Sequence, residues 1–335
     1  MELVRNNITQ TLPMAASARP VFISVINSKG GPGKSTISAD LAGICADAGL
    51  RTLGIDIETQ PTYSCYYPLG YEAPGGIMEL LTNTASPDNS TIISRTTHPL
   101  LDLVKSNDPL DQLRTLLQIA PDGRLRLFQQ LSRFRQYDVI IGDTQGAVSA
   151  LPEVATMASD VIFCPTVPKI PDAREFFRGT FGMFHGLNNL YSMFCRPFPR
   201  VVVGINRMGR TNVDSDALPE IEAAVAGGFP NITFPVEMLP FQIWELTAYQ
   251  QAHALGMAVH RLEPRDIRDR VQHGAGQVML ALARHLLPAF TTQFDALAQT
   301  LQSAPSPRVS AERRQQWWKD HESSLVSTNM RNAAQ

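Results

Sequence analysis

Eight consecutive residues near the N-terminus carry the most specific chemistry of the sequence. They follow a short apolar run at 21–26 and precede a segment with helical spacing at 35–48. A strand that ends in a glycine-rich turn and continues as a helix directs several backbone N–H groups into one concavity, where a polyphosphate binds at the helix N-terminus. The sequence therefore predicts a loop that binds a nucleoside triphosphate. The loop reads Lys29-Gly30-Gly31-Pro32-Gly33-Lys34-Ser35-Thr36.

A missing glycine and a second lysine distinguish this loop from the usual pattern, G-x-x-x-x-G-K-[ST]. Lys34 is expected to contact the β- and γ-phosphates, and Ser35 is expected to provide a hydroxyl ligand for Mg²⁺. The pattern requires glycine five residues before Gly33, but Ser28 occupies that position and a second lysine, Lys29, follows it. The residues expected to bind the nucleotide in this loop are Gly30, Gly31, Gly33, Lys34, Ser35 and Thr36.

Three acidic residues follow apolar runs and are candidates for catalysis and metal binding. Asp56 and Glu58 are two residues apart at the end of the run 52–57, so both side chains lie on one face of a strand. One is suited to orient a metal-bound water and the other the attacking water of phosphoryl hydrolysis. A solvated strand end is the alternative for this pair. Asp143 ends the run 137–141 and is the expected water-mediated ligand of Mg²⁺, with Asp56 as a second such ligand.

The elements that must position these residues are short β-branched runs that alternate with helical patterns. Strands buried on both faces have this composition, and helical crossovers between them predict an α/β fold with a doubly wound, mostly parallel sheet. Ligands of such sheets bind at the carboxyl ends of the strands, so the loop and the acids are expected to share one crevice. The runs are 21–26, 52–57, 101–104, 139–141, 161–163, 201–205 and 232–236.

Composition narrows the class of protein. With 335 residues, 44% hydrophobic and 18% charged, the chain is long enough for a large α/β domain, and its net charge of −2 gives no global electrostatic reason to bind nucleic acid. Four scattered cysteines form neither a zinc motif nor a disulfide framework, which is typical of a cytoplasmic protein. We expect a flexible lead at 1–20, an ATPase domain at 21–302 that ends in a helical extension, and a linker, short helix and disordered tail at 303–335.

Taken together, these motifs resemble the ParA/MinD superfamily of deviant Walker A ATPases, which have P-loop NTPase topology, and within it the ParA (Soj-like) partition branch. The resemblance rests on the loop, on the motif 56–60 and on the run 137–143, and it extends to about Pro264. It implies that Lys29 reaches across a dimer interface to the partner's nucleotide. It also implies that Asn206 and Arg207 frame the adenine, and a switch-like segment after Asp143 gives Gly146 as an amide donor to the γ-phosphate.

A physical argument for Lys29 stands beside this resemblance. Two triphosphates brought face to face concentrate negative charge, and a cation from the opposite subunit relieves their repulsion only when the γ-phosphate is present. ATP is then expected to favour a homodimer that ADP does not. The alternative is that Lys29 is a solvated loop residue.

Two departures from the family pattern affect activity and DNA binding. Glu58 and Thr59 replace the usual Asp-Pro, and the extra methylene of Glu58 can misplace a water-orienting carboxylate, so either slow turnover or a mainly nucleotide-binding role is expected. Phe241 and Trp244 stand where relatives often have DNA-contacting arginines. The replacement candidates are Arg261, Arg265, Arg268 and Arg270, for which a solvated face of mixed charge is the alternative.

The resemblance implies a slow ATPase that is stimulated by a ParB-like partner. With ATP and Mg²⁺ bound, the homodimer is expected to bind DNA non-specifically at the nucleoid and to segregate or position a plasmid, a chromosome or a mobile element. The alternative is a MinD-like, membrane-associated positioning switch, which requires an amphipathic C-terminal helix. The segment 311–321 contains two tryptophans among mostly polar residues, so membrane binding is not expected.

Overall fold

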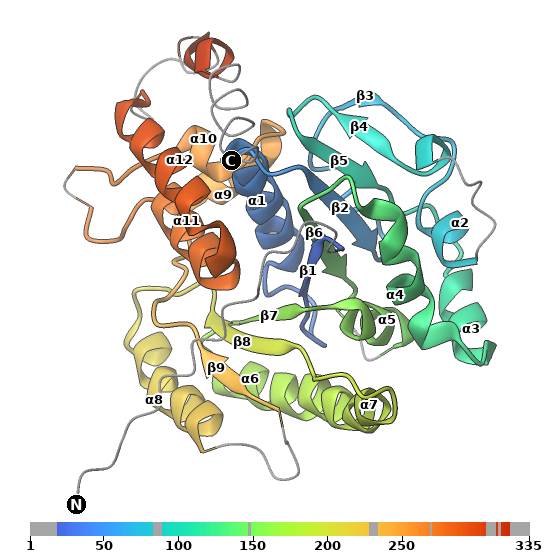
Figure 1. Cartoon of the computed structure of the whole chain (residues 1–335). Helices are drawn as coiled ribbons and strands as arrows, with labels where there is room; N and C mark the ends of the chain where they lie inside the picture. The colour runs from blue at the N-terminus through green and yellow to red at the C-terminus, as the bar shows by residue number, and fades with distance from the viewer. Residues whose placement is uncertain are drawn as a thin grey trace, which may run out of the picture.

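A twisted sheet forms the centre of the molecule, with helices on both of its faces (Figure 1). The computed structural model describes residues 19–82, 89–146, 149–227, 234–268, 270–305, 313 and 316–321. Among these, nine strands follow the order β3-β4-β5-β2-β6-β1-β7-β8-β9. The strands are β1 Val21–Val25, β2 Thr52–Ile57, β3 Leu69–Tyr71, β4 Ser94–Thr96, β5 Leu101–Val104, β6 Val139–Thr144, β7 Val161–Thr166, β8 Arg200–Ile205 and β9 Val236–Met238.

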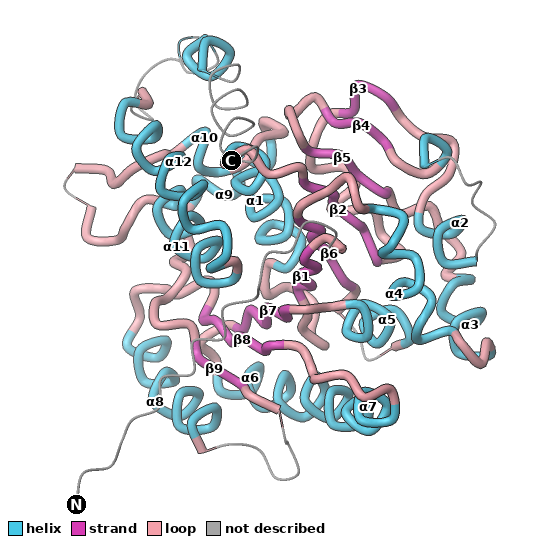
Figure 2. The backbone as a smooth tube through the Cα atoms, in the orientation of Figure 1, coloured by secondary structure: helices cyan, strands magenta, loops and turns pink. Residues whose placement is uncertain are grey.

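The pairing confirms the predicted doubly wound, mostly parallel sheet. All pairs from β5 to β9 in the sheet order are parallel. β3 and β4, which lie at one edge of the sheet (Figure 2), pair in antiparallel fashion, and the sequence did not predict them. Two strands are longer than predicted, since β6 continues to Thr144 and β7 to Thr166. Of the predicted run at 232–236, residues 232 and 233 lie outside the described part of the chain, and β9 begins at Val236.

Helices cover the two faces of the sheet and enclose a large hydrophobic core on each face, and a smaller cluster packs around Ile205 and Met208. Alternate residues of β1 point into different cores: Phe22 packs among residues of α3, α4 and α5, while Ile23 packs among residues of α1, α11 and α12. The helices are α1 Lys34–Asp47, α2 Ile77–Thr82, α3 Gln112–Ile119, α4 Arg126–Gln130, α5 Ala150–Ala158, α6 Ile170–Phe176, α7 Gly182–Met193, α8 Asn212–Ala226, α9 Thr247–Ala254, α10 Val259–Leu262, α11 Ala275–Leu286 and α12 Thr291–Ser303.

The C-terminal region contacts the main domain through a tryptophan. Residues 316–321 are helical, and Trp318 is buried, with its indole N–H donating to the carbonyl of Arg261 at 3.1 Å. The Arg261 guanidinium lies 4.8 Å from the centre of the same ring. Most of the predicted lead at 1–20 and tail at 303–335 lies outside the described residues. Within the described part of the chain, no helix combines the length and apolarity needed to cross a bilayer.

Candidate nucleotide-binding site

The glycine-rich loop has the backbone conformation that its sequence predicts. Gly31 and Gly33 have φ angles of 91° and 84°, in the left-handed region that side chains disfavour. α1 begins immediately afterwards at Lys34, so its first amide groups face the loop. A Cβ on Gly33 would also lie 2.6 Å from the side-chain nitrogen of Asn206, which leaves space only for glycine. The loop therefore presents a helix N-terminus at the carboxyl end of β1.

Lys34 connects the loop to the acidic residues. Its side chain is buried, and Nζ donates to the carbonyl oxygen of Lys29 at 3.1 Å. Burial lowers the pKa of Lys34, while the nearby carboxylates of Asp143 and Glu58 oppose this shift. Lys34 is thus placed between the loop and two of the predicted catalytic and metal-binding acids.

The two strand-end aspartates face each other across neighbouring strands. Asp56 of β2 and Asp143 of β6 are register partners, and both are fully buried. Asp56 Oδ2 accepts hydrogen bonds from Ser64 N at 2.8 Å and Ser64 Oγ at 2.6 Å, and Asp143 Oδ1 accepts one from Ser38 Oγ at 3.1 Å. Burial raises the pKa of both acids, and the charge of Asp143 raises that of Asp56 further. Two buried carboxyl groups on neighbouring strands need a nearby cation or bound protons to offset their negative charge.

This arrangement fits a magnesium ion that arrives with a nucleotide. Asp56 Oδ1 is buried and has no hydrogen-bond partner among the described residues. The hydroxyl of Ser35 lowers the pKa of Asp143, so it lies beside that carboxyl group. In the described part of the chain, no group of three or more His, Cys, Asp or Glu side chains could hold a metal by itself. Mg²⁺ typically takes one or two carboxylates together with phosphate oxygens, which these residues permit.

Glu58 lies close to the same acids but is only half buried. Burial raises its pKa to about 7, the charge of Asp143 adds to this shift, and Lys34 opposes it. The backbone carbonyl of Glu58 accepts a hydrogen bond from Ser106 Oγ, and Ser106 N donates to Ser64 Oγ at 2.8 Å. Sequence reasoning missed both serines, although Ser64 holds the Asp56 side chain and Ser106 holds the Glu58 backbone.

Lys29 is turned toward a helix of its own chain. Its ammonium group pairs with Asp172, and Glu175 Oε2 lies 3.4 Å away; both carboxylates belong to α6. The Lys29 side chain remains 35% exposed. The sequence did not identify Asp172 or Glu175 as contacts of the loop, because this contact depends on how the chain turns from β7 into α6.

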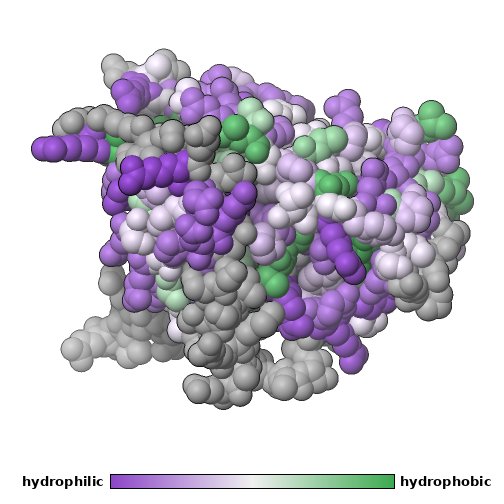
Figure 3. All heavy atoms as spheres, turned by 90° about the horizontal axis from the view of Figure 1, so that it is seen from above, coloured by the Kyte–Doolittle hydropathy of each residue, from purple (hydrophilic) through white to green (hydrophobic). Residues whose placement is uncertain are grey.

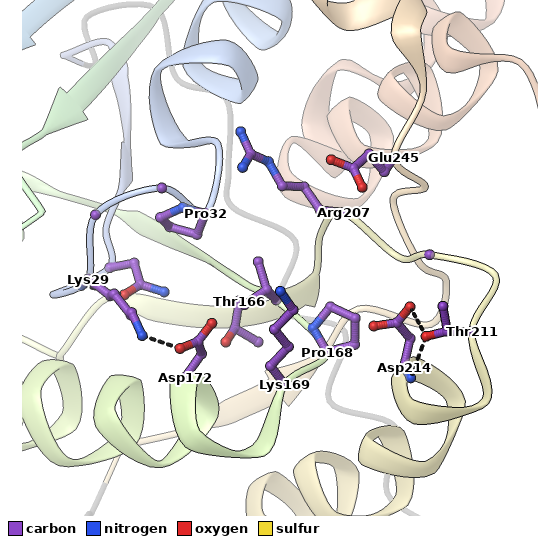
Figure 4. A pocket seen from close by; sticks show the side chains of 15 residues that line it. Lys29, Pro32, Thr166, Pro168, Lys169, Asp172, Arg207, Thr211, Asp214 and Glu245 are labelled. Atoms are coloured by element: carbon purple, nitrogen blue, oxygen red, sulfur yellow. Dashed lines mark hydrogen bonds and ion pairs between the residues drawn. The ribbon is translucent and has the colours of Figure 1, made fainter.

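Arg207 lines a cavity of about 460 Å³ beside the loop, which is large enough for a small ligand. The side-chain amide of Asn206 donates a hydrogen bond to the carbonyl of Pro32 at 2.6 Å, which fixes this part of the loop. Figure 4 shows Lys29 and Pro32 on one side of the cavity and Arg207 on another, with Lys169 below them beside Pro168.

The remaining loop residues also lie at this strand end. Gly146 packs against the loop so closely that a Cβ there would lie 2.8 Å from the Lys29 carbonyl, and Thr36 lies in the first turn of α1. The structure thus brings all predicted site residues to the carboxyl ends of β1, β2, β6 and β8, while their individual roles stay predictions.

The candidate DNA-contacting arginines are divided into two groups. Arg261 pairs with Asp47 at 2.6 Å, and Arg270 pairs with Glu263. The side chains of Arg265 and Arg268 are exposed. Of these four arginines, only Arg265 and Arg268 have side chains that are largely exposed to solvent.

Comparisons with known proteins agree with this geometry. A family model described as an AAA domain matches residues 21–173. The cell division protein PomZ of Myxococcus xanthus is 26% identical over 279 residues, which cover 82% of this chain and 80% of PomZ. The sporulation initiation inhibitor protein Soj of Bacillus subtilis is 31% identical over 148 residues, which are 43% of this chain and 57% of Soj.

Solved structures show the same fold. Apo McdA of Cyanothece superposes with a TM-score of 0.60 at 18% identity and covers 84% of this chain and 99% of McdA. The septum site-determining protein MinD of Pyrococcus horikoshii, complexed with Mg-ADP, superposes with a TM-score of 0.57 at 16% identity and covers 82% of this chain and 98% of MinD. At such identities the likeness concerns the fold.

Proposed function

We propose that this chain, which belongs to the ParA/MinD superfamily of P-loop ATPases of the partition type, forms an ATP-dependent homodimer that segregates or positions DNA. The observation that carries the proposal is the second lysine of the loop. Lys29 lines the cavity, and among the described residues its ammonium group pairs with two carboxylates that are themselves partly exposed. Such a cation is available to a nucleotide in a second subunit.

The side chains around the loop suit the hydrolysis of ATP. Lys34 would hold the β- and γ-phosphates, while Ser35 and Asp143 would hold Mg²⁺. Bound Mg²⁺ would supply positive charge that offsets the charge developing on the phosphate oxygens. Asp56, fixed by Ser64, would orient a metal-bound water, and Glu58 would orient the attacking water. Slow turnover, raised by a ParB-like partner, is part of this proposal.

The DNA-positioning function is favoured over a membrane-bound switch. Trp318, which a membrane-binding C-terminal helix would expose, is buried against Arg261. On the face seen in Figure 3, hydrophobic residues form small separate patches among hydrophilic ones, whereas membrane binding by an amphipathic helix needs a broad apolar face. The cargo is proposed only as a class, a DNA molecule. The relatives are named for cell division, sporulation and a virulence plasmid, and these different names do not specify one cargo.

Dimerisation provides the first test. The mass of the protein is measured by light scattering without nucleotide, with ADP and with ATP and Mg²⁺, for the wild type, Lys29→Gln and Lys34→Ala. A dimer is expected only for the wild type with ATP. Lys319→Gln is the control, because Lys319 is exposed on the C-terminal helix, away from the loop. A wild type that stays monomeric with ATP, or a Lys29→Gln variant that dimerises normally, overturns the ATP-dependent dimer.

DNA and membrane binding are then compared on the same preparation. Retention of non-specific DNA is expected with ATP only and should fall steeply with salt. The double substitution of Arg265 and Arg268 by Gln should weaken it, while Arg51→Gln, at an exposed arginine of a separate ion pair with Asp138, should not. Binding to anionic vesicles instead of DNA would favour the membrane-associated alternative.

A further inference from the structure

The helical segment that follows β7 forms hydrogen bonds with the start of the glycine-rich loop. Thr180 Oγ1 accepts a hydrogen bond from Ser28 N at 2.9 Å, and it donates to Ser28 Oγ at 3.1 Å. Thr180 is fully buried, whereas Ser28 is half buried. Ser28 occupies the position where the usual loop pattern has glycine, so the contact involves the departure that distinguishes this loop.

Thr180 reaches the loop from an irregular part of that helix. Residues Phe177–Phe181 form one π-helical turn between α6 and α7, and such single turns are frequent at functional sites. Phe176 and Phe181 anchor this turn, because both are buried and their rings meet edge to face at 5.5 Å. The anchored turn fixes the position of Thr180 relative to the loop.

The same helix also holds the next residue of the loop. Lys29 N donates to Asn27 Oδ1 at 2.7 Å, and Asn27 Nδ2 donates to the carbonyl of Pro165 at 2.7 Å, so the backbone before Lys29 is tied to β7. The Lys29 side chain extends along α6 to Asp172. The backbone that leads to Lys29 is therefore held through Asn27 and Ser28, whereas its partly exposed side chain is held by surface ion pairs.

We infer that Thr180 is a positioning residue for Lys29. By holding Ser28, it keeps the Lys29 backbone in place, so that the side chain alone exchanges Asp172 for the nucleotide of a second copy of this chain. This inference rests on the proposed ATP-dependent dimer and adds a residue to it. A merely structural Thr180 would affect stability alone, whereas a positioning residue affects dimerisation more than nucleotide binding.

The test uses Thr180→Val, which keeps the shape and removes the hydroxyl, and Thr180→Ser, which keeps the hydroxyl. Leaving the Ser28 amide without its acceptor is expected to weaken the ATP-dependent dimer at least about tenfold. Affinity for a fluorescent ADP analogue should change less than about threefold, because Lys34 and the helix N-terminus stay in place. Thr156→Val is the matched control: Thr156 is a fully buried threonine of α5 that donates to the Pro152 carbonyl.

A second measurement separates this inference from the proposed function. Hydrogen exchange of the amides of residues 27–31 is followed in the full chain without nucleotide. The exchange should be faster in Thr180→Val than in the wild type, Thr180→Ser or Thr156→Val. If the wild type does not dimerise, the proposed function fails, and the exchange data alone decide whether Thr180 fixes the loop.

Three results would overturn the inference. The first is normal dimerisation by Thr180→Val together with wild-type exchange. The second is an equal loss of dimer in Thr180→Val and Thr156→Val, which would indicate a loss of packing in general. The third is a Thr180→Ser variant that fails as Thr180→Val does, since the hydroxyl would then not be the group that matters.

Discussion

The ammonium group of Lys29 and the carboxylate of Asp172, 143 residues apart in the sequence, form an ion pair within one chain. If Lys29 serves a second subunit, as proposed, this pair must open when the dimer forms. The two side chains are 35% and 24% exposed, and solvent weakens ion pairs at such sites. The Lys29–Asp172 ion pair is thus a weak interaction that competes with dimerisation.

Asp172→Asn should therefore strengthen the ATP-dependent dimer. Because this surface ion pair is weak, its removal should lower the dimer dissociation constant by up to about fivefold, measured by sedimentation at several protein concentrations. Glu220→Gln is the control, because it breaks the exposed ion pair with Arg174 of α6 and leaves Lys29 untouched. A weaker dimer in Asp172→Asn would show instead that the carboxylate supports the active form.

Lys34→Ala should weaken nucleotide binding strongly. Its charge would contact two phosphate groups, and the loss of one hydrogen bond to a charged group costs ~1.5–3 kcal/mol, so the affinity for a fluorescent ATP analogue should fall ~10-fold or more. Because Asp143 and Glu58 would lose a nearby cation, thermal unfolding is measured in parallel. A folded Lys34→Ala variant with normal ATP affinity would contradict the assignment of the loop.

The central parallel strands could be predicted from the sequence because both of their faces are buried. The run 52–57 and the strand Thr52–Ile57 coincide, since a strand covered on both faces is mostly apolar and does not alternate with polar residues. The edge strands β3 and β4 have three residues each and no such signal, so the sequence did not predict them.

Contacts between distant residues could not be predicted in the same way. Thr180 meets Ser28 across 152 residues, and Ser106 meets Ser64 across 42, through turns whose geometry no local pattern encodes. The pairing of Asp56 with Asp143 follows from sheet register, which is also a tertiary property. Residue types at strand ends therefore indicated the site, whereas the side chains that hold it in place came only from the structure.

Glu58→Gln should slow hydrolysis without preventing ATP binding. The half-buried carboxylate lies near Lys34 and Asp143, where it is placed to orient the attacking water. The loss of a general base or water-orienting acid typically costs 10²–10⁴-fold, so kcat should fall at least ~100-fold, with KM changing less than about threefold. Phosphate release and ATP affinity are measured for the same samples. Glu58→Asp is the control that keeps the charge, and it should retain more activity than Glu58→Gln; equal activity in the wild type and Glu58→Gln would exclude the role.

Asp40 should make the stability of the protein fall as the pH rises. It is fully buried in α1, with Oδ1 accepting hydrogen bonds from Val259 N at 2.7 Å and from the Tyr66 hydroxyl at 3.3 Å. Burial raises its pKa from 3.8 to about 8, against the effect of these two hydrogen bonds. Between these two values the folded chain holds a proton that the unfolded chain has released, so the free energy of unfolding decreases as the pH rises through that window.

Asp40→Asn removes this proton linkage while keeping an acceptor at the same position. Urea unfolding is measured for the wild type and the variant at about pH 5 and about pH 8, and the stability of the variant relative to the wild type should increase between them, because only the wild type must retain a proton. Asp295→Asn is the control, since Asp295 lies in an exposed ion pair with Arg284. A difference between Asp40→Asn and the wild type that is the same at both pH values, or that decreases, would show that Asp40 is ionised in the folded chain.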